Sequence, residues 1–160
     1  MKEKEELKTK YFEAVRKNAV NDVRTILEQN PAFVNSKILG DATLLNEQVW
    51  KNKKIVNISL SETRSSPAIH FSVFHGHYEM LKTLLEFGAD INSIGYENNH
   101  EFTPPIVLAA WEGGDAVLEL LLQNGADPNL KSSNKVSAMT TAIKHDKEST
   151  VRILKEYGAI

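Results

Sequence analysis

The chain has 160 residues, of which 41% are hydrophobic and 25% charged, so it can bury a core and has the usual size of one domain. Its formal net charge is −2, from 19 Lys and Arg against 21 Asp and Glu, and supplies none of the broad positive field that binds a phosphate backbone. The absence of cysteine excludes disulfides, thiolate zinc sites and thiol chemistry.

The first ten residues are a mixed run of Lys and Glu with one Leu and lack the apolar stretch of a secretory signal. The longest strongly apolar runs, such as Ile106 to Trp111, are far shorter than the roughly 20 residues that cross a bilayer. We therefore expect a soluble, cytoplasmic monomer that binds neither membranes nor nucleic acid.

Two short helices are predicted between Tyr11 and Asn35. Phe12 to Val15 and Val23 to Leu27 carry their apolar side chains. Asparagine tolerates the left-handed backbone conformation that closes a helix, so Asn30 is expected to end the second helix in that conformation. Residues 11–35 are therefore predicted to form a helix pair.

Residues 36–64 follow a different pattern. Leu44, Leu45, Gln48 and Val49 have helical spacing, whereas Ile55 to Leu60 alternates apolar and polar side chains as a half-exposed strand does. Two interpretations are open for this segment: an enlarged loop that holds a short helix, or a divergent helix pair that has lost its second helix.

Three further helix pairs are predicted in residues 65–92, 102–129 and 136–160. Each ends in a glycine after an apolar helical face, where a left-handed residue closes the last turn without a side-chain clash. These helix-ending residues are Gly88, Gly125 and Gly158. Pro or Ser suits the start of each first helix. The starting residues are Pro67, Pro104 and Ser137. A small or polar break separates the two helices twelve residues before each final glycine. The breaks are Gly76, Gly113 and Asp146.

The final glycines are 37 and 33 residues apart, and the sequence Gly-Ala-Asp-x-Asn follows both Leu85 and Leu122 within a few residues. A unit of about 33 residues with a turn, two helices and this ending resembles the ankyrin repeat. The resemblance covers residues 65–160 well and residues 11–35 more weakly. It implies an all-α solenoid of about four helix-pair units in a single domain, 1–160.

The distance from Asn30 to Gly88 is 58 residues, which is one period plus an insertion of about 25. Residues 36–64 are therefore expected to be an enlarged finger between the first and second units, or a degenerate extra repeat. The end units should have polar outer faces, because nothing covers them. Lys8, Lys10, Glu13 and Arg16 at one end and Lys155 at the other fit this expectation.

The resemblance implies that a partner protein binds the concave surface, which is formed by the ends of the first helices and by the finger loops. The two positions before each break identify candidate residues, namely Arg16, Lys17, Phe74, His75, Trp111, Glu112, Lys144 and His145. Candidate finger-tip residues are Thr63, Arg64, Ser66, His100, Glu101, Thr103, Ser133, Asn134 and Val136.

Phe74 and Trp111 are the strongest candidates, because large aromatic side chains on a solvated face are typical anchors of interfaces. The alternative is that they pack between first helices or against the insertion.

His70 matches the histidine near the start of the repeat motif, which joins neighbouring units by buried hydrogen bonds, so we assign it a structural role. His77 also fits a unit-to-unit role. The turn residues Asp90 and Asp127 are expected to accept local backbone hydrogen bonds.

No metal, cofactor or catalytic site is predicted. His75 and His77 are two residues apart, so the spacing indicates that they face differently and do not form a metal site with His70. The sequence lacks a glycine-framed nucleophile turn, a phosphate-binding glycine loop and a His-Glu-x-x-His helix. We expect the protein not to be an enzyme.

The leading functional hypothesis is a module that binds a partner protein through the concave surface and the finger loops. One alternative is a dedicated inhibitor, or an immunity-type neutraliser of an enzyme or toxin, that uses residues 36–64. A second alternative is a domain that positions another part of a larger regulatory or host-directed protein.

Overall fold

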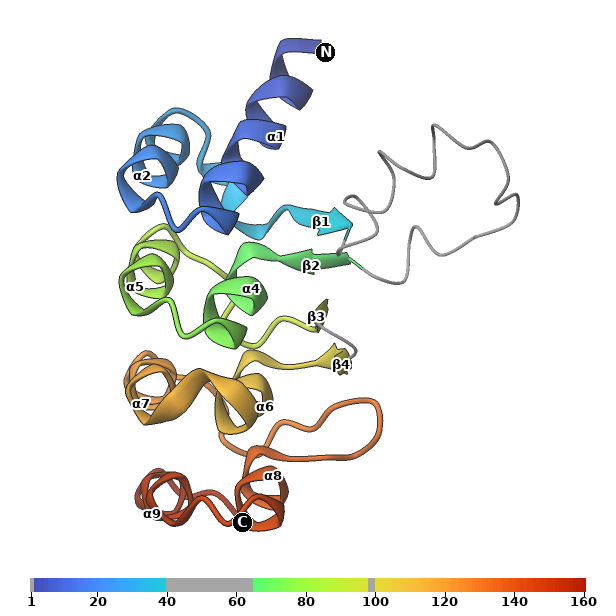
Figure 1. Ribbon diagram of the computed structural model, residues 1–160, viewed down its shortest axis with the longest axis vertical. Coiled ribbons are helices and arrows are strands. Elements are labelled where there is room, and N and C mark those ends of the chain that lie inside the picture. The colour runs from blue at the N-terminus through green and yellow to red at the C-terminus, as the bar shows by residue number, and fades with distance from the viewer. Residues whose placement is uncertain (1, 40–64, 98–99) are drawn as a thin grey trace, which may run out of the picture.

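The computed structural model describes residues 2–39, 65–97 and 100–160, which form a stack of helix pairs (Figure 1). The inner helices form the middle column of Figure 1; they are α1 (Lys2–Arg16), α4 (Ala68–Phe74), α6 (Pro105–Leu108) and α8 (Ala138–Lys144). The outer helices form a second column; they are α2 (Val20–Gln29), α5 (Tyr78–Glu86), α7 (Gly114–Gln123) and α9 (Glu148–Glu156). The predicted solenoid of about four helix-pair units is confirmed.

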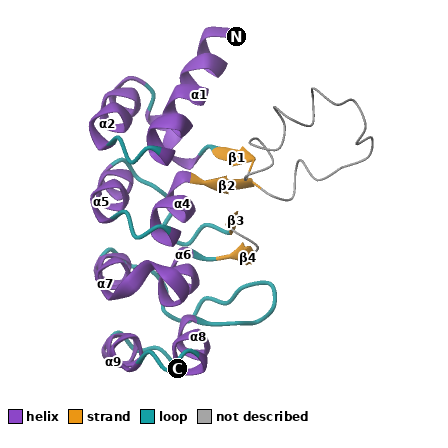
Figure 2. Cartoon of the chain, in the orientation of Figure 1, coloured by secondary structure: helices purple, strands orange, loops and turns teal. Residues whose placement is uncertain are grey.

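Short β-hairpins extend from the inner helices on the side away from the outer helices (Figure 2). In the first, β1 (Lys37–Leu39) pairs antiparallel with β2 (Ser65–Pro67); in the second, β3 (Gly95–Glu97) pairs with β4 (His100–Thr103). An isolated bridge between Lys131 and Ser137 closes the corresponding loop of the last unit. The strand pairs were not predicted. In each pair, one strand follows a unit and the other leads into the inner helix of the next unit.

The first unit lies directly on the second. Helix α2 contacts α5, and α1 contacts α4. Arg24 Nη2 lies 2.7 Å from Glu86 Oε2 and donates to Thr83 Oγ1 at 3.2 Å, which ties α2 to α5. At the flanks of the long segment, Leu39 lies opposite Ser65 in the strand pair. The helix and strand predicted at residues 44–49 and 55–60 lie outside the described residues.

The predicted left-handed glycines are found at the end of the second, third and fourth units, with φ of 82°, 88° and 79° at Gly88, Gly125 and Gly158. The prediction for Asn30 is wrong, because its φ is −140°. Asn30 precedes Pro31, whose ring disfavours helical and left-handed conformations of the residue before it. The chain instead enters a 3-10 helix, Pro31–Asn35.

The break between inner and outer helices is a residue of positive φ in each described unit, with φ of 53° at Asn18, 66° at Gly76 and 54° at Asp146. In the third unit the positive φ is found at Gly114 and not at the predicted Gly113; its φ of 77° and ψ of 165° are an extended conformation that glycine adopts readily. The inner helix continues from α6 into a π-helical turn, Ala109–Gly113, which carries it one residue further.

One hydrophobic core runs through all four units. Equivalent positions show where it ends: Val73 and Ala110 are each 0% exposed between units, whereas Ile143 in the last unit is 59% exposed. Of the predicted polar residues, Lys10, Glu13 and Lys155 are exposed at the two ends, whereas Lys8 and Arg16 are half-buried. The outermost units therefore combine uncovered core positions with charged side chains.

Asparagine side chains join the turns of successive units. Asn35 Oδ1 accepts from the backbone N–H of Asp90 at 2.7 Å, and its Nδ2 donates to Gly88 O at 3.1 Å. Asn92 repeats this contact with the N–H of Asp127, and Asn129 with the N–H of Ile160 and Gly158 O. The carboxylates of Asp90 and Asp127 accept from the N–H two residues further along the chain, as predicted.

His70 also joins neighbouring units, which confirms its structural role. Its side chain is 0% exposed, and Nε2 donates to Thr103 O at 3.0 Å at the end of β4. Gly95 on β3 lies against the ring, because a Cβ atom there would be 2.8 Å from His70 Nε2. Burial lowers the pKa of His70 from 6.5 to about 4, although the hydrogen bond to Thr103 opposes this shift.

We predict that Gly95→Ala lowers the free energy of unfolding by about 1–3 kcal/mol, because the added methyl group overpacks against the His70 ring. Urea unfolding followed by circular dichroism measures the change. In a His70→Ala background the methyl group has space, so the same substitution should cost less than about 0.5 kcal/mol. Equal costs in the two backgrounds would contradict the contact.

We predict that the stability is highest above about pH 6.5 and falls toward pH 4. The unfolded chain binds a proton at His70 near pH 6.5, whereas the folded chain does so only near pH 4. Full titration of this difference corresponds to about 3 kcal/mol. Urea unfolding at several pH values should show this slope, and His70→Ala should leave only a smaller one, to which His77 contributes. An unchanged slope in the variant would refute the assignment to His70.

Candidate functional site

The eight candidate residues form a row along the stack, which we call the inner-helix row. Each unit contributes two of them from the C-terminal end of its inner helix. The row consists of Arg16 and Lys17, Phe74 and His75, Trp111 and Glu112, and Lys144 and His145. Lys17, His75, Glu112, Lys144 and His145 are exposed, and Arg16, Phe74 and Trp111 are half-buried. The stacking of the units therefore brings all eight to the same end of the inner helices.

In the second unit, the exposed ring of His75 contacts the rings of three neighbouring residues. Its centroid lies 4.2 Å from that of Phe71, 5.1 Å from that of Phe74 and 5.6 Å from that of His77. Phe74 also packs against the core. Phe71 and His77 were not among the candidate residues, although the spacing of four residues from Phe71 to His75 was a signal for their contact.

The prediction that His75 and His77 face differently is wrong. Their rings stack with an interplanar angle of 28°, because the left-handed turn at Gly76 folds the chain back between them. His70 is buried and bonds the next unit, so it does not join them. The described residues hold no group of three or more side chains arranged to bind a metal ion. The ring of His77 contacts those of Phe71 and His75, which belong to its own unit.

The third and fourth units meet at Trp111. The centroid of its ring lies 4.6 Å from that of His145, at the end of α8. Lys147 Nζ donates a hydrogen bond to the backbone carbonyl of Trp111. The π-helical turn thus presents Trp111 to the fourth unit, where two residues of that unit contact it.

The charges of the row are unevenly distributed. Arg16 and Lys17 lie at its first end and Lys144 at its last, whereas Glu112 lies between them. Near the last end, Asp115 accepts a 2.7 Å hydrogen bond from Thr150 Oγ1. Hydrogen bonds from Ser149 and Thr150 lower the pKa of Asp115, and the charges of Lys147 and Arg152 act in the same direction.

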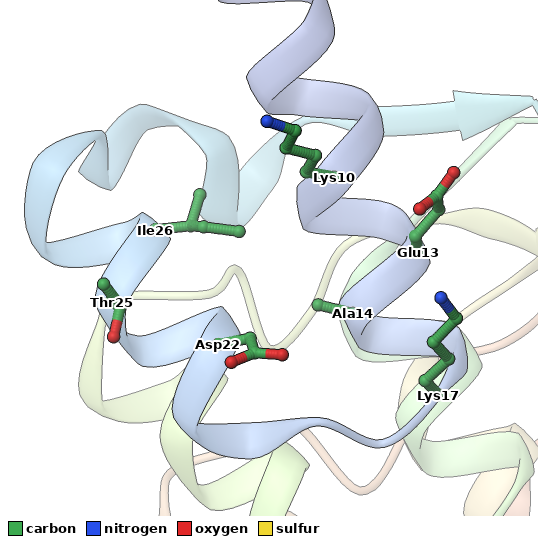
Figure 3. Close-up of a pocket in the computed structure, with 7 residues that line it drawn as sticks. All are labelled: Lys10, Glu13, Ala14, Lys17, Asp22, Thr25 and Ile26. Carbon is green, nitrogen blue, oxygen red and sulfur yellow. The ribbon is translucent and has the colours of Figure 1, made fainter.

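A hollow of about 370 Å³ lies between α1 and α2, with Lys17 of the row at its edge (Figure 3). Its lining residues are Lys10, Glu13, Ala14, Lys17, Asp22, Thr25 and Ile26. Lys10, Asp22 and Thr25 stand where the second unit has Ala68, Met80 and Thr83, all buried. The hollow is therefore the uncovered end of the stack, and its two Lys and two acidic residues balance each other.

The finger-tip candidates are only partly as predicted. Ser66 and Thr103 are buried, which is contrary to the prediction, because they lie where β2 and β4 lead into the inner helices. Ser133 and Asn134 are exposed in the loop of the last unit, and Val136 is half-buried. His100 and Glu101 belong to β4. Thr63 and Arg64 lie outside the described residues.

Stacked helix pairs with left-handed turns and hairpins between units define a helix-pair solenoid. The sequence profile of ankyrin repeats (3 copies) matches residues 12–132. The chain therefore belongs to the ankyrin-repeat family. The fourth helix pair, α8 and α9, lies beyond the matched range but has the same turn geometry.

Curated relatives are similar over parts of their length. The chain is 30% identical over 101 residues to a protein of Treponema pallidum (strain Nichols) named as ankyrin repeat-containing, covering 63% of this chain and 33% of that protein. It is 33% identical over 125 residues to an ankyrin repeat protein of fowlpox virus (strain NVSL), covering 72% and 28%. Human ankyrin repeat family A protein 2 is 37% identical over 78 residues, covering 49% and 24%. The chain thus spans about a third or less of these relatives.

Ankyrin repeats are in general modules of protein–protein interaction and not enzymes, and the names of these relatives describe repeats and no catalytic activity. Within the described ranges, no helix is both long enough and apolar enough to span a membrane.

We predict that His75→Ala raises the pKa of His77. Burial is the larger cause of the low pKa of His77, and the charge of His75 is the second, so the variant should shift the pKa upward without restoring it fully. NMR titration of the imidazole C–H resonances measures the shift. His145→Ala, which changes a histidine of the fourth unit, is the matched control and should leave His77 unchanged. A lower or equal pKa in His75→Ala would contradict the interaction.

Proposed function

We propose that the protein binds a partner protein through the inner-helix row on its concave surface, with support from the finger loops. Phe74 and Trp111 are the anchors. The observation that carries this proposal is that two large aromatic side chains from adjacent units lie half-buried at the ends of the inner helices, in a family of interaction modules.

The contacts of the two anchors favour this role because they restrict the side chains before binding. Phe74 packs on the core and makes a T-shaped contact with the ring of His75. Trp111 is held by the ring of His145 and by the bond from Lys147 to its backbone. An anchor that is already ordered loses less conformational entropy when a partner binds.

The charged residues of the row form the rim. Arg16, Lys17, Glu112 and Lys144 flank the anchors, and charges at the edge of an interface affect specificity and the association rate more than affinity. The monomeric state, the cytoplasmic location and the absence of nucleic-acid binding stay predictions.

We predict that Phe74→Ala combined with Trp111→Ala weakens partner binding at least about thirtyfold, because loss of even one anchoring aromatic costs about 2 kcal/mol or more. Affinity capture from the native source, followed by mass spectrometry, identifies proteins recovered by the wild type and lost by the double variant. Tyr157→Ala removes an exposed aromatic from the end of α9, outside the row, and is the matched control.

Circular dichroism must show that both variants remain folded. Equal recovery of every captured protein by wild type and double variant would refute the anchor assignment.

The inhibitor hypothesis depends on residues 36–64, most of which lie outside the described residues, and it stays a prediction. The register of β1 and β2 offers a clean test, because Leu39 and Ser65 are paired neighbours. Replacing residues 40–64 by an Asn-Gly turn should close a hairpin and leave the repeats folded. Inhibition of a captured enzyme that survives this replacement would exclude the segment as the inhibitory element.

A further inference from the structure

The inner helix of the third unit ends differently from those of the other units. In the first, second and fourth units, one residue of positive φ makes the turn, and the N–H after it bonds the carbonyl five residues back. These donors are Ala19, His77 and Lys147, at 2.9, 2.8 and 2.9 Å. We call this arrangement the regular turn. The third unit instead has the π-helical turn Ala109–Gly113, which we call the π turn, and its positive φ lies one residue later, at Gly114.

Two adjacent glycines make both turns available to the third unit. Gly113 stands where the regular turn has its residue of positive φ, and glycine adopts that conformation without a Cβ clash. Gly114 has φ of 77° and ψ of 165°, a region open essentially to glycine alone. In the other units the residue after the break is Ala19, His77 or Lys147, each with a Cβ atom, which disfavours the π turn there.

The fourth unit contacts the third on both sides of this glycine pair. Before the pair, Lys147 Nζ donates to the carbonyl of Trp111, and the last carbonyls of a helix need donors from outside it. After the pair, Asp115 accepts from Thr150 Oγ1 at 2.7 Å. Both contacts depend on the backbone path from Trp111 to Asp115, which differs between the two turns. Of the residues that directly follow a break, Lys147 alone has an ammonium group, so the contact with the carbonyl is specific to this unit boundary.

We infer that the end of the third inner helix exchanges between the π turn and the regular turn, and that Lys147 holds it in the π turn. A π turn spreads one turn over more residues than an α-helical turn does, so the exchange rotates its side chains about the helix axis. Trp111 is one of them, and in the π turn its ring lies against that of His145. The π turn is the form that presents Trp111 to a partner. This inference rests on the proposed function and adds the regulation of one of its anchors.

The exchange makes the position of Trp111 depend on what else Lys147 binds. An acidic group that draws the ammonium group away from the Trp111 carbonyl removes a charge-assisted hydrogen bond and weakens the π turn. A partner shifts the exchange only by the difference in its affinity for the two forms. Phe74 precedes the regular turn at Gly76 and lacks this adjustment.

Variants of the two glycines test the exchange in the full chain. A Cβ atom at Gly114 would meet nothing within 4 Å, so Gly114→Ala acts through the backbone alone and should convert the third unit to the regular turn. Gly113→Ala is the matched control, because it penalises the regular turn and should leave the π turn in place. NMR of the isotope-labelled protein follows the C–H resonances of His145, which the Trp111 ring shifts. We expect new positions for them in Gly114→Ala and wild-type positions in Gly113→Ala.

Variants of Lys147 test what holds the π turn. Lys147→Met removes the donor and keeps a long side chain, so it should raise the population of the regular turn about fivefold, as expected for the loss of one hydrogen bond. The His145 resonances should then move toward their positions in Gly114→Ala. Lys147→Arg keeps a donor and should restore the wild-type positions. Lys155→Met makes the same change elsewhere on α9 and should move none of them.

Four contrary results would each overturn the inference. They are unchanged His145 resonances in Gly114→Ala, unfolding of that variant although the regular turn accepts alanine, equal effects of Lys147→Met and Lys155→Met, and failure of Lys147→Arg to restore the spectrum. Recovery of a captured partner should be lower with Gly114→Ala than with Gly113→Ala, and equal recovery would refute the regulation of the anchor.

The NMR measurements use the free protein, so they are independent of the proposed function. That function is judged by capture with the Phe74 and Trp111 double variant. A partner that needs those aromatics, together with His145 resonances that no variant moves, would leave the proposed function standing and the exchange refuted. Moving resonances with recovery that ignores the aromatics would do the reverse.

Discussion

The two middle helix pairs of the described residues have two apolar faces, and neither face is buried until a neighbouring pair covers it. The contrast between Val73 or Ala110 and Ile143 shows this constraint, because equivalent positions are closed between units and open at the end. Stability in such a stack is a sum of units and of contacts between neighbours. Stacking also forms the inner-helix row, because side chains far apart in the sequence, such as Arg16 and Lys144, come to the same end of the inner helices only when all four units are stacked.

Polar contacts set how the units are stacked, since apolar contact alone does not fix their register. Asn35, Asn92 and Asn129 each bond the turn of the next unit. His70 reaches Thr103 in the next hairpin, and Gly95 makes room for its ring. These groups are buried or bridge defined backbone atoms, so a shifted register would leave them without partners. The inner-helix row inherits its alignment from these contacts.

The sequence was sufficient for local features and insufficient for contacts across units. The left-handed conformation of the helix-ending glycines could be predicted, because a glycine that follows an apolar helix commonly ends that helix. These residues are Gly88, Gly125 and Gly158. The left-handed conformation predicted for Asn30 is wrong because Pro31 restricts the backbone of the residue before it. The helix break predicted at Gly113 is wrong because the third inner helix is one residue longer. The stacking of His75 on His77 depends on a turn that helical spacing ignores. Burial of Ser66 and Thr103 depends on the strand pairs. Strands of three or four residues are too short to show a recognisable alternating pattern in the sequence.

The pairing of Leu39 with Ser65 brings two positions that are 26 residues apart in the sequence to adjacent places at the edge of the stack. The connection between these two positions therefore begins and ends at neighbouring residues. The entropy cost of closing such a connection rises only slowly with its length. The length and sequence of this connection can therefore change during evolution, or be exchanged by an engineer for another peptide, with little effect on how the helix pairs meet. The repeats act as a fixed frame at a site where new sequence can be accommodated.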